Sequence, residues 1–287
     1  MSAVLAVDFL PFDLDFLLLG RWPLILIGTV VLIRQLLPES KVTLPEVVRE
    51  AVFVVSAFLL YFLVRANVDG REIEAIRHAT QVVDVEKTLR IFWEADLQRW
   101  VLGTGPLLNL ANWTYVWGHF PVIVFVAIWL FMIHRDTYPV YRNAFLISGV
   151  IGLVIYATLP VAPPRFLDGY GFVDTLAFRE SAQQLSLPSA LLNEYAAVPS
   201  LHFSWNMLAG IAIVRHAPHS LLKPLGVVMP TAMFLSIVCT GNHFIIDGIA
   251  GGAVALMGLA TALALRFYVH EARAQGNERL AALAAFV

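Results

Sequence analysis

The sequence predicts an all-α fold, a polytopic transmembrane helical bundle of about six or seven spans with an interfacial amphipathic helix. Of its 287 residues, 59% are hydrophobic and only 14% are charged, and the mean hydropathy is +0.75. About a quarter of the residues of a soluble domain are charged. A helix needs about 20 mostly apolar residues to cross a bilayer. Seven stretches approach that length: residues 16–37, 47–66, 111–133, 142–161, 202–217, 222–240 and 244–268.

The N-terminal segment contains Asp8, Asp13 and Asp15 and lacks a basic region before its apolar run. We therefore do not expect a cleaved signal peptide. The single Cys239 excludes an intrachain disulfide, and a formal net charge of −2 argues against a nucleic-acid partner. The domains we expect are a transmembrane hairpin, a membrane catalytic domain and a tail, over residues 1–80, 81–270 and 271–287.

The first long connection, residues 67–110, contains an amphipathic stretch, VVDVEKTLRIFWEADLQRWVL. Apolar residues recur there at helical spacing, and charged residues occupy the other faces: Glu86, Lys87, Arg90, Glu94 and Arg99. Trp93 and Trp100 suit the headgroup region of a membrane. The pattern leaves two alternatives open, a helix that lies in the headgroup region and a helix that packs over the end of the bundle.

The second long connection, residues 162–201, is rich in Pro, Gly and Ser and contains APPRFLDGYGF. A loop of that length in a compact protein tends to be functional. The shorter loops hold the positive charges that predict a cytoplasmic location: Arg34, Lys41, Arg49, Arg135, Arg142, Arg215 and Lys223. Both long connections would then lie on the extracytoplasmic side of a cell (inner) membrane.

The segment GNHFIIDGIAGG carries the first candidate site. His243 and Asp247 are four residues apart, so on a helix they share one face. An aspartate beside an imidazole can accept its Nδ1–H and leave Nε2 as a nucleophile or base. Ionisable residues at the end of a transmembrane helix indicate function. The alternative is a buried His–Asp pair that only joins two helices, and this segment alone does not decide between the two.

Two weaker signals precede it. In AAVPSLHFSW, Ser200 is suited to cap a helix, which places His202 in the first turn, where anions are favoured. In PVAPPRF, Arg165 has the fixed charge and planar fork that suit phosphate. Spans five and six form a hairpin, and span four ends on the same side. These residues and the His243–Asp247 pair can therefore converge at one face of the membrane.

The ordered set PPR, PSLHFSW and GNHFIID resembles the type 2 phosphatidic acid phosphatase superfamily. The resemblance is strongest to its branch of inositol phosphorylceramide synthases and related inositolphosphotransferases. The motifs span residues 160–252, and the segments EKTLRIFWEADLQRW and WTYVWGHFPV also resemble that branch. The resemblance implies an integral-membrane enzyme that needs no metal and no cofactor and works by double displacement.

The resemblance also implies a role for each candidate residue. His243 would attack the phosphorus and form a phosphohistidine, with Asp247 orienting it. His202 would protonate the departing oxygen and then deprotonate the incoming hydroxyl or water. Arg165 and the backbone amides near Ser200 would hold the phosphoryl oxygens.

Three positions depart from the general pattern of the superfamily. Thr158 stands where a lysine is usual, Ile237 where an arginine is usual, and Leu201 where Pro-Ser-Gly-His has its glycine. A site with two cations fewer suits a phosphodiester or a phosphotransfer reaction better than a doubly charged phosphomonoester. Further candidate site residues are Arg90, Arg99, His119 and Asn242. For His119, within an aromatic apolar span, a packed and hydrogen-bonded histidine is favoured over a catalytic one.

The leading hypothesis is a lipid phosphotransferase that moves a phosphorylated, inositol-phosphate-like head group from a phospholipid donor to a lipid hydroxyl acceptor. One alternative is a lipid phosphate or polyprenyl diphosphate phosphatase, in which water is the acceptor. A proton-coupled transporter is an alternative of another class, although transporter sites lie near the midplane and not at helix ends. An inactive scaffold is disfavoured because both histidines and the aspartate are present. No Cys/His cluster has the spacing of metal ligands, and no nucleotide-binding loop occurs.

Overall fold

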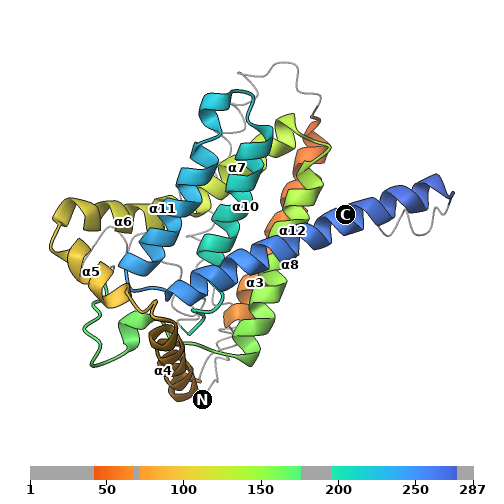
Figure 1. Cartoon of the computed structure of the whole chain (residues 1–287). Helices are drawn as coiled ribbons and strands as arrows, with labels where there is room; N and C mark the ends of the chain where they lie inside the picture. The colour runs from red at the N-terminus through yellow and green to blue at the C-terminus, as the bar shows by residue number, and fades with distance from the viewer. Residues whose placement is uncertain (1–41, 67–70, 176–194, 277–287) are drawn as a thin grey trace, which may run out of the picture.

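The computed structural model describes residues 42–66, 71–175 and 195–276. Within these ranges the chain is a helical bundle (Figure 1), which confirms the predicted fold class. The first predicted span, residues 16–37, lies outside the described residues. The helices are α3 (Leu44–Ala66), α4 (Glu72–Leu89), α5 (Glu94–Leu102), α6 (Gly105–Trp117), α7 (Phe120–Ile133), α8 (Tyr138–Thr158), α10 (Leu201–His216), α11 (Leu225–Cys239) and α12 (Ile245–Ala274), with short 3-10 helices at Pro164–Phe166 and Ser220–Leu222.

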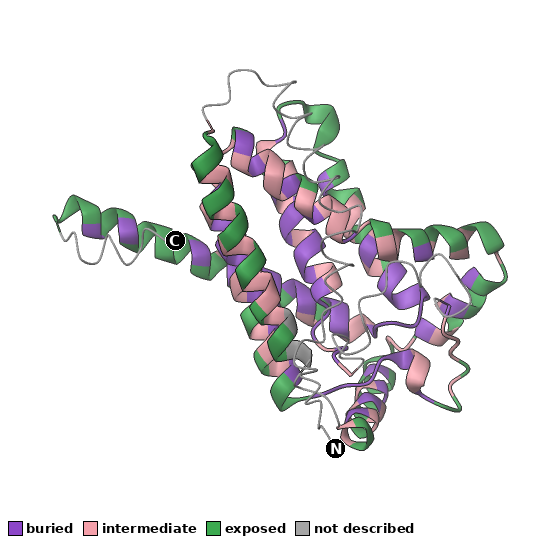
Figure 2. Ribbon diagram, turned by 180° about the vertical axis from the view of Figure 1, so that it is seen from behind, coloured by how far each residue is buried: buried purple, intermediate pink, exposed green. Residues whose placement is uncertain are grey.

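Three helical segments of the described chain are long and apolar enough to cross a membrane: Tyr138–Thr158, Ser220–Cys239 and Ile245–Ala274. A fourth candidate is the pair α6 and α7, predicted as one span, which bends by 47° at its break. The break precedes Pro121, which has no N–H to continue the hydrogen-bond ladder of α6. Many residues of α3 are exposed (Figure 2), and the apolar ones among them include Val48, Val52, Val55 and Leu60.

The amphipathic stretch forms two helices, α4 and α5, and not one. The break follows Arg90, which adopts a left-handed conformation with φ of 59° and ends α4. The buried side of α4 consists of Ala75, Ala79, Val83 and Glu86, and the three apolar residues pack against the loops at the end of the bundle. Trp93 and Trp100 remain exposed. The structure therefore favours packing over the bundle end, with the tryptophans turned away from it.

The centre of the bundle lies between α8, α10 and α12. Its buried cluster includes Ala144, Trp205, Leu208 and Ala255. Helices α10 and α11 touch backbone to backbone, because a Cβ on Gly210 would stand 2.3 Å from the carbonyl oxygen of Gly226. Close packing of this kind needs small residues at the crossing. This contact fixes α10, whose first turn contains His202, against α11, which ends shortly before His243.

The two ends of the bundle differ in character. One end gathers the C-terminal ends of α8 and α11 and the N-terminal ends of α10 and α12 (Figure 1). There, the segments before α10 and after α8 pair through reciprocal backbone hydrogen bonds of Val161 with Tyr195 and Ala197. At the other end, Arg135 and Arg142 form ion pairs of 2.8 and 2.9 Å with Glu46 and Glu50 of α3.

Candidate active site

His243 lies in the turn between α11 and α12. Its Nδ1 is 2.9 Å from the carbonyl oxygen of Ala197 and 3.3 Å from Oδ2 of Asp247. A carbonyl oxygen can only accept a hydrogen bond, so Nδ1 carries the ring proton and the basic lone pair lies on Nε2. Asp247 is fully buried, and its Oδ2 also accepts the amide of Phe244 at 2.8 Å. Sequence reasoning named Asp247 as the acceptor and missed the closer acceptor, a backbone group that no motif displays.

His202 lies in the first turn of α10, with its ring centroid 5.8 Å from that of His243. Its ring stacks on Tyr115 at 4.5 Å and contacts His119 at 4.3 Å. Nδ2 of Asn206 donates to the carbonyl oxygen of His202 at 2.9 Å and lies 3.1 Å from Nδ1 of the buried His119. His119 is therefore a packed, hydrogen-bonded histidine that contacts the ring of His202.

Arg165 lies on the same side as His243, and the loop that carries the histidine holds it there. Its amide donates to the carbonyl oxygen of Gly241 at 3.0 Å, and its Nη1 donates to Oδ1 of Asn242. Nε is 3.4 Å from Oδ2 of Asp174. Asn242, a further sequence candidate, therefore orients the guanidinium and lies next to the histidine. A guanidinium is suited to contact phosphoryl oxygens, and these hydrogen bonds hold it next to the loop of His243.

The remaining sequence candidates are placed differently. Ser200 is fully buried, its amide donates to the carbonyl oxygen of Asp247 at 2.9 Å, and its Oγ accepts the amide of Phe203 as the N-cap of α10. The amide of Ser200 and the accepting side of its hydroxyl are thus used within the protein, and the phosphate-binding role of the amides near it stays a prediction. Arg90 is exposed at the end of α4, and Arg99 is exposed and paired with Asp96 at 2.8 Å. The structure does not bring these two arginines to the histidines.

The positions that depart from the family pattern have structural roles. Ile237 is fully buried, and its carbonyl oxygen accepts the amides of Asn242 and His243 at 3.2 and 3.0 Å. The Leu201 side chain packs against Gly152, where a Cβ would stand 3.0 Å from it. Thr158 is exposed, and its hydroxyl donates to the carbonyl oxygen of Val154. Apolar packing and helix hydrogen bonds thus replace the expected cations.

Two glutamates that the pattern assigned to polar outer faces are fully buried at the start of α12. Oε1 of Glu94 accepts the amide of Ile245, and Oε1 of Glu86 accepts the amide of Ile246, each at 2.8 Å. Burial and the adjacent Glu94 carboxyl raise the pKa of Glu86 to about 9. The sequence pattern did not identify either residue as part of the site. The only signal is that both lie on the side of the amphipathic segment that packs against the bundle.

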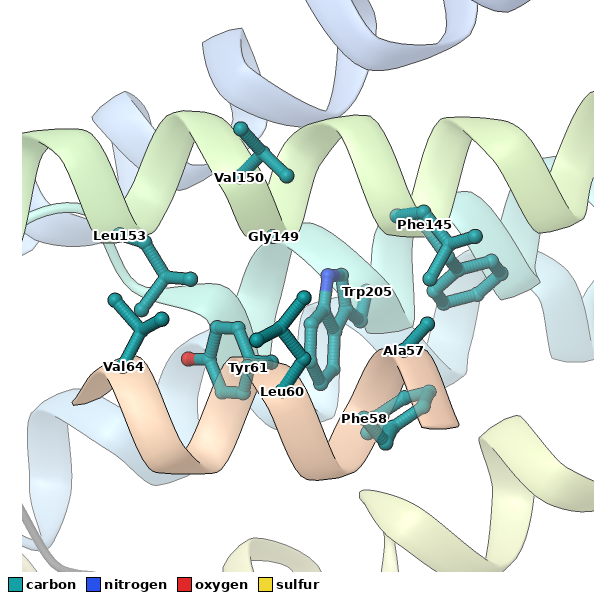
Figure 3. Close-up of a pocket in the computed structure, with 11 residues that line it drawn as sticks. Ala57, Phe58, Leu60, Tyr61, Val64, Phe145, Gly149, Val150, Leu153 and Trp205 are labelled. Carbon is teal, nitrogen blue, oxygen red and sulfur yellow. The ribbon is translucent and has the colours of Figure 1, made fainter. Parts of the chain in front are cut away.

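An apolar cavity of about 380 Å³ lies between α3 and α8 (Figure 3). Phe58, Tyr61, Gly149 and Leu153 line it, together with the ring of Trp205 from α10. That ring stacks on His119 at 5.8 Å, with an angle of 5° between the ring planes. The indole Nε1 donates to the hydroxyl of Ser148 at 3.1 Å. Trp205 therefore lies between this cavity and the histidines.

The fold and the site together are those of a helical membrane bundle that gathers two histidines, an aspartate and an arginine at one end. The chain belongs to the PAP2 superfamily, whose family model matches residues 80–261. It is an integral membrane protein.

The chain is similar to phosphoinositol dihydroceramide synthase of Bacteroides thetaiotaomicron, with 27% identity over 156 residues. The match covers 50% of this chain and 50% of that protein, so the chain spans about half the length of this curated relative. No solved structure matches the chain.

Proposed function

We propose that this protein transfers a phosphorylated, inositol-phosphate-like head group from a phospholipid donor to a lipid hydroxyl acceptor. The arrangement of His243 carries the proposal. Two oxygens hold its Nδ1–H, which leaves Nε2 with the lone pair that attack on phosphorus requires. The ring of His202 lies 5.8 Å away, and Arg165 is hydrogen-bonded to the loop that carries His243. The likeness to a protein named phosphoinositol dihydroceramide synthase supports the choice of head group.

The reaction proceeds in two displacements. In the first, Nε2 of His243 forms a bond to phosphorus while the bond from phosphorus to the oxygen of the donor lipid breaks. His202 gives its proton to that oxygen, so the donor leaves as an alcohol. In the second, His202 takes the proton of the acceptor hydroxyl, whose oxygen bonds to phosphorus as the bond to Nε2 breaks. The carbonyl of Ala197 and the carboxylate of Asp247 stabilise the positive charge of the phosphorylated ring.

Transfer is favoured over phosphomonoester hydrolysis by the charge of the site. Positions 158 and 237, where the family pattern has cations, hold an exposed threonine and a buried isoleucine. Arg165 supplies a single fixed positive charge, which matches a phosphodiester with one negative charge better than a phosphomonoester with two. We also place the site on the extracytoplasmic side, because Arg135 and Arg142 lie at the opposite end of the bundle.

The test is a transfer assay with the purified full chain in detergent. Phosphatidylinositol labelled in its head group is supplied with and without a ceramide or diacylglycerol-type acceptor, beside a His243→Ala control. We expect label in the acceptor lipid, and none with the variant. Release of label only as a water-soluble head group would identify a hydrolase. Orthophosphate release from phosphatidic acid or a polyprenyl diphosphate would assign the phosphatase activity, and wild-type turnover by His243→Ala would refute the mechanism.

A further inference from the structure

The first turn of α12 is held by side chains from distant parts of the chain. The amide of Phe244 is capped locally by Asp247, whereas those of Ile245 and Ile246 donate to Glu94 and Glu86, which are 151 and 160 residues away. The first amides of a helix have no partner within the helix and need one elsewhere. Helices α4 and α5 therefore fix the segment that begins directly after His243.

Burying two carboxyl groups as acceptors for these amides has a high free-energy cost. Glu86 and Glu94 are both fully buried, and the second oxygen of each, Oε2, meets no hydrogen-bond donor among the described residues. Two buried carboxylates side by side cannot both be ionised at low cost. A proton on Glu86 removes its charge, and burial together with the adjacent Glu94 carboxyl favours that proton.

We propose that Glu86 and Glu94 act as positioning residues of the phosphoryl-transfer site. Their hydrogen bonds hold the first turn of α12, and with it Asp247 and the ring of His243, in the geometry needed for attack on phosphorus. This inference rests on the proposed function of His243. It assigns helices α4 and α5 a role in catalysis and not only at the membrane surface.

Loss of the Glu86 proton should disturb the site in a defined direction. The groups that face Glu86 are Glu94 from α5 and Asp247 from α12, both acidic, while Lys87 on its own helix lies over the rings of Phe92 and Tyr170. Deprotonation places a further negative charge against these two carboxyls. The pKa of Glu86 is raised to about 9, so the arrangement persists below that pH and is lost as the pH rises through it. Activity should fall over the same range.

The decisive variants are Glu86→Gln and Glu86→Ala in the full chain. Glutamine keeps an acceptor for the amide of Ile246 and a permanent donor toward Glu94, and it has no proton to lose. We expect Glu86→Gln to retain activity within about threefold at pH 7 and to lose the decline near pH 9. We expect Glu86→Ala to lower kcat by about 10²-fold with little change in KM, because a displacement of the His243 ring by about 1 Å has an effect of that size. Glu74→Gln and Glu74→Ala are matched controls, because Glu74 lies on the same helix but pairs with Arg71.

Amide hydrogen exchange of the peptide that contains Ile245 and Ile246 provides a measure independent of activity. Its protection should fall by about tenfold or more in Glu86→Ala and, in the wild type only, above pH 9 after correction for intrinsic exchange. Unchanged protection in Glu86→Ala would overturn the inference. If Glu86→Ala cannot be purified, the same alkaline loss of protection in Glu86→Gln would still overturn it. Wild-type turnover by His243→Ala would instead refute the proposed function, and the exchange result would still report on the glutamates.

Discussion

Substituting Gly251 with alanine tests whether the contact between α10 and α12 sets the catalytic geometry. A Cβ on Gly251 would stand 2.3 Å from the carbonyl oxygen of Ser200, whose amide donates to the carbonyl oxygen of Asp247 at 2.9 Å. Ordinary contact begins at 3.4 Å, so the backbones must separate by about 1 Å, the difference between 3.4 and 2.3 Å. Helix α10 carries His202, and α12 begins directly after His243. The two rings must therefore move apart.

We expect two effects of Gly251→Ala. Overpacking of a tight contact costs about 1–3 kcal/mol of stability. A displacement of about 1 Å between the two histidines should lower kcat by about 10²-fold. The assay is the labelled-lipid transfer reaction, with rates expressed per folded protein from a thermal unfolding curve in the same detergent.

Gly258→Ala is the matched control. It lies on the same helix, and its Cβ would stand 2.7 Å from the carbonyl oxygen of Ala144 in α8, away from the histidines. This variant should also lose stability but keep kcat close to the wild-type value. Equal kcat losses in both variants, or full activity in Gly251→Ala, would show that the contact at Ser200 does not set the distance between the histidines.

Three further predictions concern the site. In Asp247→Asn the side chain can still accept the amide of Phe244, but it cannot offset the positive charge of a phosphorylated His243. We therefore expect kcat to fall by about 10²- to 10⁴-fold in the transfer assay. A fall below threefold would contradict the role of the carboxylate. Arg165→Lys keeps the positive charge but loses the planar guanidinium that Asn242 orients, so kcat/KM should fall by about 10²-fold. Activity equal to wild type would show that Arg165 is not part of the site. Activity should survive EDTA, and loss of turnover that added metal restores would refute a metal-independent mechanism.

The composition of the sequence was enough to predict the fold class. A chain with 14% charged residues cannot cover a soluble surface of this size, and its apolar stretches match the length of a membrane helix. The spacing of His243 and Asp247 placed them on one helical face because four residues complete about one helical turn. In the structure His243 lies in the turn before α12 and not on the helix, and the Asp247 carboxyl in the first turn reaches Nδ1 of the histidine at 3.3 Å.

The break between α4 and α5 shows where the sequence pattern stops being informative. Periodicity runs through residues 82–102, yet Arg90 ends α4 in a left-handed conformation. An arginine gives little local signal for such a conformation, which glycine or asparagine adopts more readily. The packing of α4 and α5 against different parts of the bundle decides the break, and that packing is a property of the whole fold.

The sequence by itself therefore determined the membrane class, the helix-rich fold and the side of the bundle on which His202, His243 and Asp247 gather. These features follow from local spacing and from the length and apolar character of each segment. Only the tertiary structure decided that the carbonyl of Ala197 holds Nδ1 of His243 and that Glu86 and Glu94 cap α12. The physical reason is that a periodic pattern places every charged residue on the side that faces solvent. A carboxyl group can be buried only where a hydrogen-bond donor meets it, and here the donor is a backbone amide from a distant part of the sequence.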